Sequence, residues 1–311
     1  MQVLQDFYLT SVSGRIDYKE ANPLGPLADL VGTWKGRGFN QIWRPFHDKP
    51  GGRQDRFLEL NETVETLQFD EIPGDIPNRG FLQDDINLHG IRYLQQIQDA
   101  NVLGQNGKPA GIHIEPGLWI STPQTSNPKD GPTVARMANI PHGTSLVAQG
   151  SALPVIDHRP PIGKASITPF PVGQPGKPIP FPEQDLETAS QFRTPKGDIP
   201  NVTQAIVDDP NTVLRQAIAN LNIVATSTLR ISTSPLNPPT SGGGADNIAF
   251  LQGDGGGPNA QAAKIDAIFW IETVKDASGK TRQLLQYTQT VLLNFNGLSW
   301  PHVSVATLEK Q

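Results

Sequence analysis

The sequence predicts an all-β protein, built as one antiparallel β-barrel of about ten strands, with an irregular insertion that is rich in proline and glycine and contains a short helix. Three observations support this fold class. Segments rich in β-branched and aromatic residues alternate between apolar and polar positions, which is typical of half-buried strands. No strand–helix–strand rhythm separates them. Closing the sheet into a barrel would remove the exposed edges that so many strands otherwise present.

Ten segments carry the alternating pattern. They are residues 32–40, 57–69, 90–98, 111–121, 133–139, 144–150, 223–232, 264–275, 282–295 and 301–309. Two connections have the residues of tight hairpins, namely the pair Asn106 and Gly107 and the stretch "KDASGKTR" at 275–282. The first and last segments are expected to belong to one closed sheet, so that both ends of the pattern lie in the same barrel.

A segment dense in proline interrupts this pattern after the sixth predicted strand. Eleven prolines fall within residues 151–200, in stretches such as "PFPVGQPGKPIPFPEQ". Proline cannot donate a ladder hydrogen bond and favours extended chain. Residues 151–222 are therefore predicted to be an insertion packed on the exterior of a single barrel domain that spans residues 1–311.

A short helix and two loops are predicted in and after the insertion. Val213, Leu214, Ile218 and Leu221 follow an Asp-Pro pair and have the spacing of an amphipathic helix. Further on, the runs "TSGGGADN" and "GDGGGPNAQ" flank the segment 248–252. No Gly-Lys-Ser/Thr follows either run, so both are predicted to be loops and not phosphate-binding sites.

Composition narrows the function classes. A formal net charge of −5 provides no basic footprint for nucleic acid. The absence of cysteine excludes disulfides, thiolate metal sites and cysteine nucleophiles. Residues 1–20 lack the basic and apolar regions of a secretory leader, and no run of apolar residues is long enough to predict a membrane span. A cytoplasmic, soluble protein is therefore expected.

The stretch "GTWKGRG", residues 32–38, places three glycines around Trp34 in the first predicted strand. A glycine in a strand marks a sharp bend or the close approach of another backbone. The large apolar ring of Trp34 is expected to close one barrel end. Interpreted in this way, the glycine motif has a structural role only.

The same stretch fits the Gly-x-Trp-x-Gly-x-Gly motif of the nitrobindins, haem-binding β-barrels related to the calycins. Three further stretches resemble nitrobindin segments in the family's order: "IRYLQQIQDANVLGQNGKPAGIHIEPGLWI", "ARMANIPHGTSLVAQG" and "LLQYTQTVLLNFNGLSWPHVSVATLEK". The resemblance covers roughly residues 27–150 and 264–310. It implies a lipocalin-like barrel of about ten strands that holds haem b in a wide cleft.

Carried over by motif, the resemblance implies that His302 is the axial, metal-binding ligand of the haem iron. Imidazole is also the usual nitrogen ligand where thiolate is unavailable. Ser304, Ala306 and Leu308 share its strand face and are small near the ligand, which would leave room for a macrocycle. Taken without the family matches, a lone Pro-His pair favours a histidine at a strand start that only hydrogen-bonds a loop carbonyl.

The resemblance also implies the other cofactor-binding residues. His113 and Ile112 correspond to positions that line the haem pocket without ligating iron. Ile42 stands where the family has a haem-contacting threonine, Phe46 matches the phenylalanine after it, and Leu292 is expected in the cavity wall.

A mononuclear metal site is an alternative for this region. His113 and Glu115 are two residues apart and point to one face of a strand, a spacing also met in metal sites. His89 and His142 are the candidates for a third ligand, and nothing in their spacing singles out either one.

Two functions from different classes remain open at this point. In the first, the haem protein binds a diatomic ligand such as nitric oxide, or acts as a peroxynitrite isomerase that forms nitrate at the iron. In the second, a haem-free barrel carries a small apolar molecule between Trp34, Phe46, Trp119 and Leu292. Both functions are compatible with a homo-oligomer.

An enzyme that works through its side chains alone is disfavoured. The sequence has no Gly-x-Ser-x-Gly and no His-Glu-x-x-His. The carboxylate pairs at 84–85 and 208–209 fall in predicted turns, where solvated charge explains them.

Overall fold

The structure, a computed structural model, describes residues 22–46, 55–127, 129, 131–234, 243–247 and 260–311. Residues 1–20, in which no leader was predicted, and the loop-flanked segment 248–252 lie outside the described residues. Within the described ranges, no helix is both long and apolar enough to cross a membrane.

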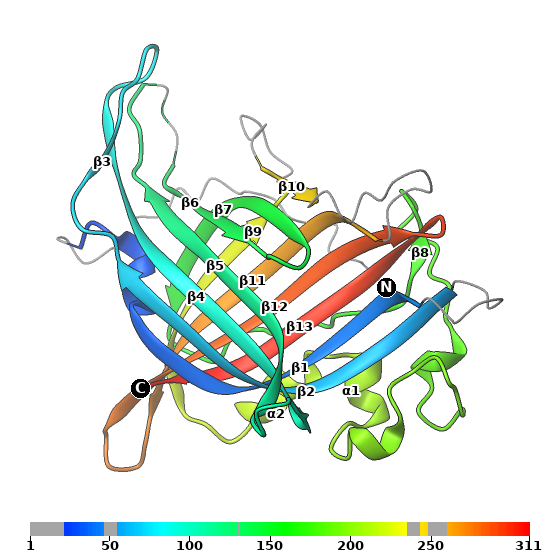
Figure 1. Cartoon of the computed structure of the whole chain (residues 1–311). Coiled ribbons are helices and arrows are strands. Elements are labelled where there is room, and N and C mark those ends of the chain that lie inside the picture. Colours follow the sequence, from blue (N-terminus) through cyan, green and yellow to red (C-terminus); the bar gives the residue numbers. More distant parts are fainter. Residues whose placement is uncertain (1–21, 47–54, 128, 130, 235–242, 248–259) are drawn as a thin grey trace.

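Ten antiparallel strands close into a barrel (Figure 1). In order around the barrel they are β1 (Gly32–Phe46), β2 (Asp55–Glu71), β4 (Ile86–Leu103), β5 (Pro109–Thr122), β6 (Thr133–Asn139), β7 (Thr144–Ile156), β9 (Ile223–Ser232), β11 (Gln261–Lys275), β12 (Thr281–Phe295) and β13 (Leu298–Lys310). Each of the ten predicted segments falls within one of these strands, and the first strand pairs with the last. The predicted all-β barrel is therefore confirmed.

Both predicted hairpin turns are present. In the β4–β5 turn the amide of Gly104 donates to the carbonyl of Lys108 at 2.8 Å, and in the β11–β12 turn Asp276 donates to Lys280 at 2.9 Å. Each turn contains a glycine with positive φ, which is the conformation that favours glycine. Three short strands were not predicted: β3 (Ile76–Asn78) pairs with β4, β8 (Phe170–Pro171) with β13, and β10 (Gly244–Asn247) with β7.

The glycines of the first strand allow the barrel to close. β1 pairs with β13 from Trp34, opposite Lys310, to Gln41, opposite Val303. A Cβ atom added to Gly36 would overlap the carbonyl oxygen of Thr307, and one added to Gly38 would overlap that of Val305. The motif is therefore required where the two ends of the sheet meet.

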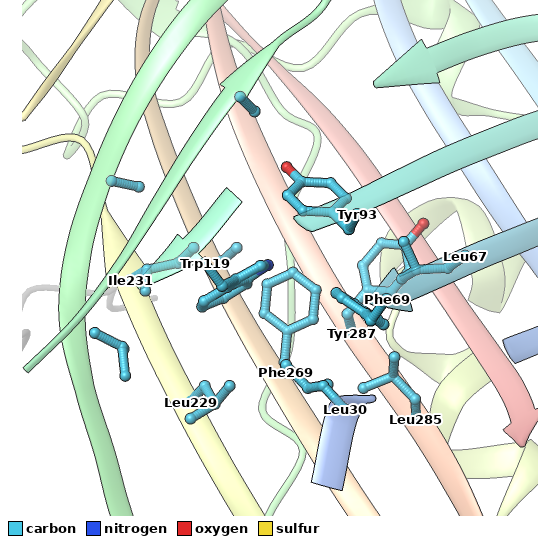
Figure 2. Packing of buried hydrophobic residues seen from close by; sticks show 14 of the residues in the cluster. Leu30, Leu67, Phe69, Tyr93, Trp119, Leu229, Ile231, Phe269, Leu285 and Tyr287 are labelled. Carbon is cyan, nitrogen blue, oxygen red and sulfur yellow. The ribbon is translucent and has the colours of Figure 1, made fainter. Parts of the chain in front are cut away.

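An apolar core fills one end of the barrel. The 3-10 helix η1 (Gly25–Leu30) lies across this end and buries Leu27 and Leu30. The indole nitrogen of Trp34 donates to the carbonyl of Leu30 at 2.7 Å, which ties the helix to the first strand. Figure 2 shows the ring of Phe269 between those of Trp119 and Tyr287, at centroid distances of 5.2 and 5.5 Å. Among the described residues, this end of the barrel is filled by a cluster of buried apolar side chains.

The chain between β7 and β9 packs against the outer wall of the barrel. Odd-numbered residues of β1 point outward, and Trp43 donates from its indole nitrogen to the carbonyl of Ile167 at 2.8 Å. Phe39 and Trp43 belong to an outer cluster with apolar residues of this segment, among them Ile206 and Leu214. In Figure 1 the light-green chain that follows β8 lies beside β1, β2 and β13. Burial of these side chains holds the segment on the barrel wall.

Helices in this segment are short. The predicted amphipathic helix is present as α2 (Thr212–Ala217), which buries Leu214, and Ile218 follows directly after it and is buried. A second helix, α1 (Gln204–Asp208), was not predicted, and two 3-10 turns, η2 (Pro182–Gln184) and η3 (Lys196–Asp198), punctuate the proline-rich part.

We expect Gly36→Ala to lower the free energy of unfolding by about 1–3 kcal/mol, because the added methyl group must push β13 away from β1. Gly111→Ala is the matched control, since its added Cβ would meet no atom within 4 Å. Chemical denaturation of both variants checks this. Equal effects of the two substitutions would contradict the role of Gly36 in closure.

Glu272 is a buried acid on the outward face of β11, beneath the same segment. Its side chain is 0% exposed, and neither carboxylate oxygen has a hydrogen-bond partner. Burial raises the pKa of Glu272 to about 8, against the nearby charge of Arg159. The carboxyl group is therefore protonated in the folded protein at neutral pH.

A carboxyl group whose pKa is raised on folding stabilises the fold fully below its ordinary pKa, near 4.5, and this contribution is lost as the pH rises through about 8. Glu272→Gln, which stays neutral, should therefore raise the free energy of unfolding at pH 8 by about 2–3 kcal/mol and flatten its decline with pH. Denaturation at several pH values tests this. The exposed Glu71→Gln serves as control and should leave the slope unchanged.

Candidate functional site

A cavity of about 280 Å³ occupies the barrel beyond the apolar core. Its wall is formed by inward-pointing residues of most barrel strands, and it combines aliphatic side chains with amides, hydroxyls and three histidines, His113, His142 and His302. A mixed wall of this kind suits a ligand that has both an apolar body and polar groups.

The cavity brings together four of the six residues predicted from sequence. Ile42 from β1, Ile112 and His113 from β5, and His302 from β13 all line it. These residues are far apart in the chain, and closure of the barrel places them around one space.

Phe46 and Leu292 do not line this cavity. Val291 and Leu293 both line it, so the alternation along β12 turns Leu292 to the other face. Phe46 ends β1, and its ring packs on Phe57 at 5.6 Å. Trp34 and Trp119, expected as walls for an apolar ligand, lie in the packed core.

His302 is held in a small polar group on the cavity wall. Its Nε2 lies 2.8 Å from Oδ1 of Asn40 and 3.3 Å from Oγ of Ser304, and Ser304 donates to the same Asn40 oxygen at 2.6 Å. Burial lowers the pKa of His302 to about 3, with smaller contributions from the other two histidines. The imidazole is therefore neutral at physiological pH, and one ring nitrogen carries a lone pair.

The other two histidines face each other. The rings of His113 and His142 meet edge to face at 5.0 Å, and Nε2 of His113 lies 3.3 Å from a carboxylate oxygen of Glu115. Burial and the neighbouring His113 lower the pKa of His142. In the described part of the chain, no group of three or more histidine or acidic side chains has the arrangement of a metal site.

A buried hydrogen-bond network separates the cavity from the apolar core. Glu115 accepts hydrogen bonds from Tyr93 and Arg136, and Arg136 also donates to Gln289 at 2.7 Å. The ion pair is enclosed on all sides, since the side chain of Glu115 is fully buried and that of Arg136 almost so.

Glu65 is a second buried acid, in a neighbouring hydrogen-bonded group, and its pKa is influenced by the charge of Glu115. It accepts from Gln95 and from the hydroxyl of Tyr287, both at 2.7 Å. Gln95 also donates to the Tyr287 hydroxyl at 3.1 Å. Gln95 and Tyr287 line the cavity, so Glu65 lies one hydrogen bond behind its wall.

The two buried acids have opposite pKa shifts. Burial raises the pKa of Glu65 to about 7, although the hydrogen bonds from Tyr287 and Gln95 oppose it. Burial would also raise the pKa of Glu115, but the charge of Arg136 and the hydrogen bonds from His113 and Tyr93 lower it to about 2. Burial raises the pKa of both tyrosines, so they stay neutral donors. The two hydrogen-bonded groups therefore hold one permanent carboxylate and one that titrates near neutral pH.

Sequence reasoning did not find Glu65, Arg136 or Tyr287. A signal existed for Glu65, which shares a strand face with Leu67 and Phe69, so alternation alone would have placed its carboxylate inside the barrel. The partners on distant strands could not be paired from spacing, because Tyr287 is 222 residues away.

The closed antiparallel barrel is consistent with a calycin-like fold, and the barrel with its internal cavity is compatible with ligand binding. No protein-family model matches the sequence, and a search of curated proteins gives no significant match. The resemblance to nitrobindins therefore rests on the sequence motifs alone.

We expect Arg136→Met to lower the free energy of unfolding by about 3–5 kcal/mol, because it leaves the Glu115 carboxylate buried without its ion-pair partner. The loss should shrink at acidic pH, where Glu115 can be protonated. The double variant Arg136→Met with Glu115→Gln is the control, and it should recover a large part of the loss. Equal destabilisation of the single and double variants would show that packing, not charge, is the cause.

Proposed function

We propose that the protein binds haem b in the barrel cavity, with His302 as the axial ligand of the iron. The observation that carries this proposal is a neutral imidazole in the wall of a ligand-sized cavity, at the position that the nitrobindin resemblance assigns to the ligand. Haem iron takes a neutral histidine nitrogen, and a second hydrogen bond to the ring orients it. Asn40 supplies such a partner here.

The chemical types of the residues around His302 are suitable for binding haem. Ile42, Ile112 and Val291 offer apolar wall, and His113 is a polar group in the same cavity. The bound haem would supply an iron that takes nitric oxide, or that converts peroxynitrite to nitrate, as the resemblance implies. In this scheme the chain orients the ligating imidazole through Asn40 and holds His113 through its contact with Glu115.

A second candidate is a haem-free barrel that carries a smaller ligand. One observation favours it. The cavity of about 280 Å³ is at the small end of ligand pockets, which span roughly 300–1,000 Å³, and a haem would have to extend beyond it. An apolar ligand would use the aliphatic wall around Ile97 and Val291.

Titration of the purified protein with haemin separates the two candidates. A haem protein should develop a strong Soret band that shifts with nitric oxide. His302→Ala should weaken haem binding by about a hundredfold, because the axial bond is lost. His113→Ala is the matched control and should retain the band, with an altered position or ligand affinity.

Two outcomes would contradict the haem proposal. One is normal haem binding by His302→Ala, and the other is no haem uptake by the wild-type protein. The second outcome, combined with binding of an apolar fluorescent probe, would favour the haem-free carrier.

A further inference from the structure

A second pocket, of about 300 Å³, opens through the side of the barrel where β2 and β4 separate. The two strands pair only from Thr63, opposite Asp99, to Glu71, opposite Ile91. Towards its start, β2 pairs instead with the segment that follows β8: the amide of Leu58 donates to Phe192 and that of Thr194 donates to Leu58. The side pocket lies between this segment, β2 and the β4–β5 hairpin.

The side pocket shares a wall with the barrel cavity. Arg44, Glu59, Asn61 and Ile112 line both spaces. Ile112 reaches both because the pairing of β4 with β5 shifts register beside it, between Ile97 and Gln98. The side pocket therefore adjoins the barrel cavity.

Negative charge predominates in the side pocket. Among its described lining residues, four are acids, Glu59, Glu62, Asp99 and Asp198, and the single basic residue is Arg44. Arg44 is paired with Glu59 at 2.6 Å. Four carboxylates against one guanidinium leave an excess of three negative charges, next to an apolar surface that includes Phe57 and Val102.

Asn61 lies in the wall between the side pocket and the barrel cavity and has an unused acceptor. Its side-chain nitrogen donates to one oxygen of Asp99 at 2.7 Å, and the other Asp99 oxygen accepts from the amides of Asn101 and Val102. An ionised carboxylate only accepts, so the Asn61 amide nitrogen must face Asp99 and its Oδ1 must point the other way. Asn61 is 7% exposed, and its Oδ1 has no hydrogen-bond partner. A buried acceptor without a partner can take a hydrogen bond from a donor on a bound molecule.

We propose that the side pocket binds a small organic cation, an ammonium group on a short apolar body, which donates a hydrogen bond to Oδ1 of Asn61. An ammonium group has only donors and carries the charge that the acids attract. Its apolar body would lie against Phe57, Val102 and Ile112. An anionic ligand is excluded by the surrounding carboxylates. The site does not depend on haem, because its residues include none of the three cavity histidines.

Three probes of equal chain length test the charge requirement: n-hexylammonium, 1-hexanol and hexanoate. Calorimetry or NMR titration of the full chain should show n-hexylammonium binding at least tenfold more tightly than 1-hexanol, and added salt should weaken it. In the NMR titration, resonances of Ala110 and Ile112 should shift. Equal binding of the alcohol, tighter binding of hexanoate, or no binding of the ammonium probe would overturn the proposal.

Two substitutions test the residues. Asn61→Leu removes the acceptor and should weaken n-hexylammonium binding tenfold or more. Asp198→Asn changes an exposed side chain, so it preserves the fold even where Asn61→Leu does not, and should weaken binding about two- to fivefold. Glu71→Gln, a distant exposed acid, is the matched control and should bind as wild type. If Glu71→Gln weakened n-hexylammonium binding as much as Asp198→Asn does, net charge alone would explain the effect, and the proposed site would be wrong.

Discussion

The pairing of β1 with β13 is the constraint on which the rest of the structure depends. It joins the two ends of the sheet, and it requires that Gly36 and Gly38 have no side chains where the carbonyls of β13 approach. Once the sheet is closed, every inward residue faces an enclosed space. Apolar, ionisable and ligand-facing side chains must therefore share one interior, and each polar group needs a partner inside it.

The interior meets this requirement in layers. Aromatic residues fill the end covered by η1, as Figure 2 shows, and the hydrogen-bonded groups around Glu65 and Glu115 lie above them. Neutralisation of Glu115 by Arg136 allows a full charge to stay buried, whereas Glu65, without a cation, shifts towards protonation. Gln95, Tyr287 and Gln289 belong to these hydrogen-bonded groups and also line the cavity, as does the neutral His302.

Alternation made the barrel predictable, because a strand with one face in the core repeats every second residue, as β4 and β6 do along most of their length. The short strands β3, β8 and β10 lack enough residues to show that period. His113 and Ile112, taken from the motif, line the cavity, whereas Leu292 does not, because a shift of one residue along β12 exchanges the two faces. Partners such as Asn61 and Asp99, or Glu65 and Tyr287, depend on the register of separate strands, which no local spacing encodes.

The proline-rich segment gives the barrel wall its shape near the site. Beyond Thr63, β2 no longer pairs with β4, so its free edge would expose unsatisfied amides and carbonyls. Residues 192–194 supply those partners, and the indole of Trp43 is anchored to Ile167 on the outer face. The β1–β2 hairpin can therefore diverge from β4, because residues 192–194 replace part of the hydrogen bonding that the edge of β2 loses. The space between the hairpin and β4 becomes the acidic side pocket, and the diverging hairpin carries Ile42 and Asn61, so the segment influences both spaces while lying outside the barrel.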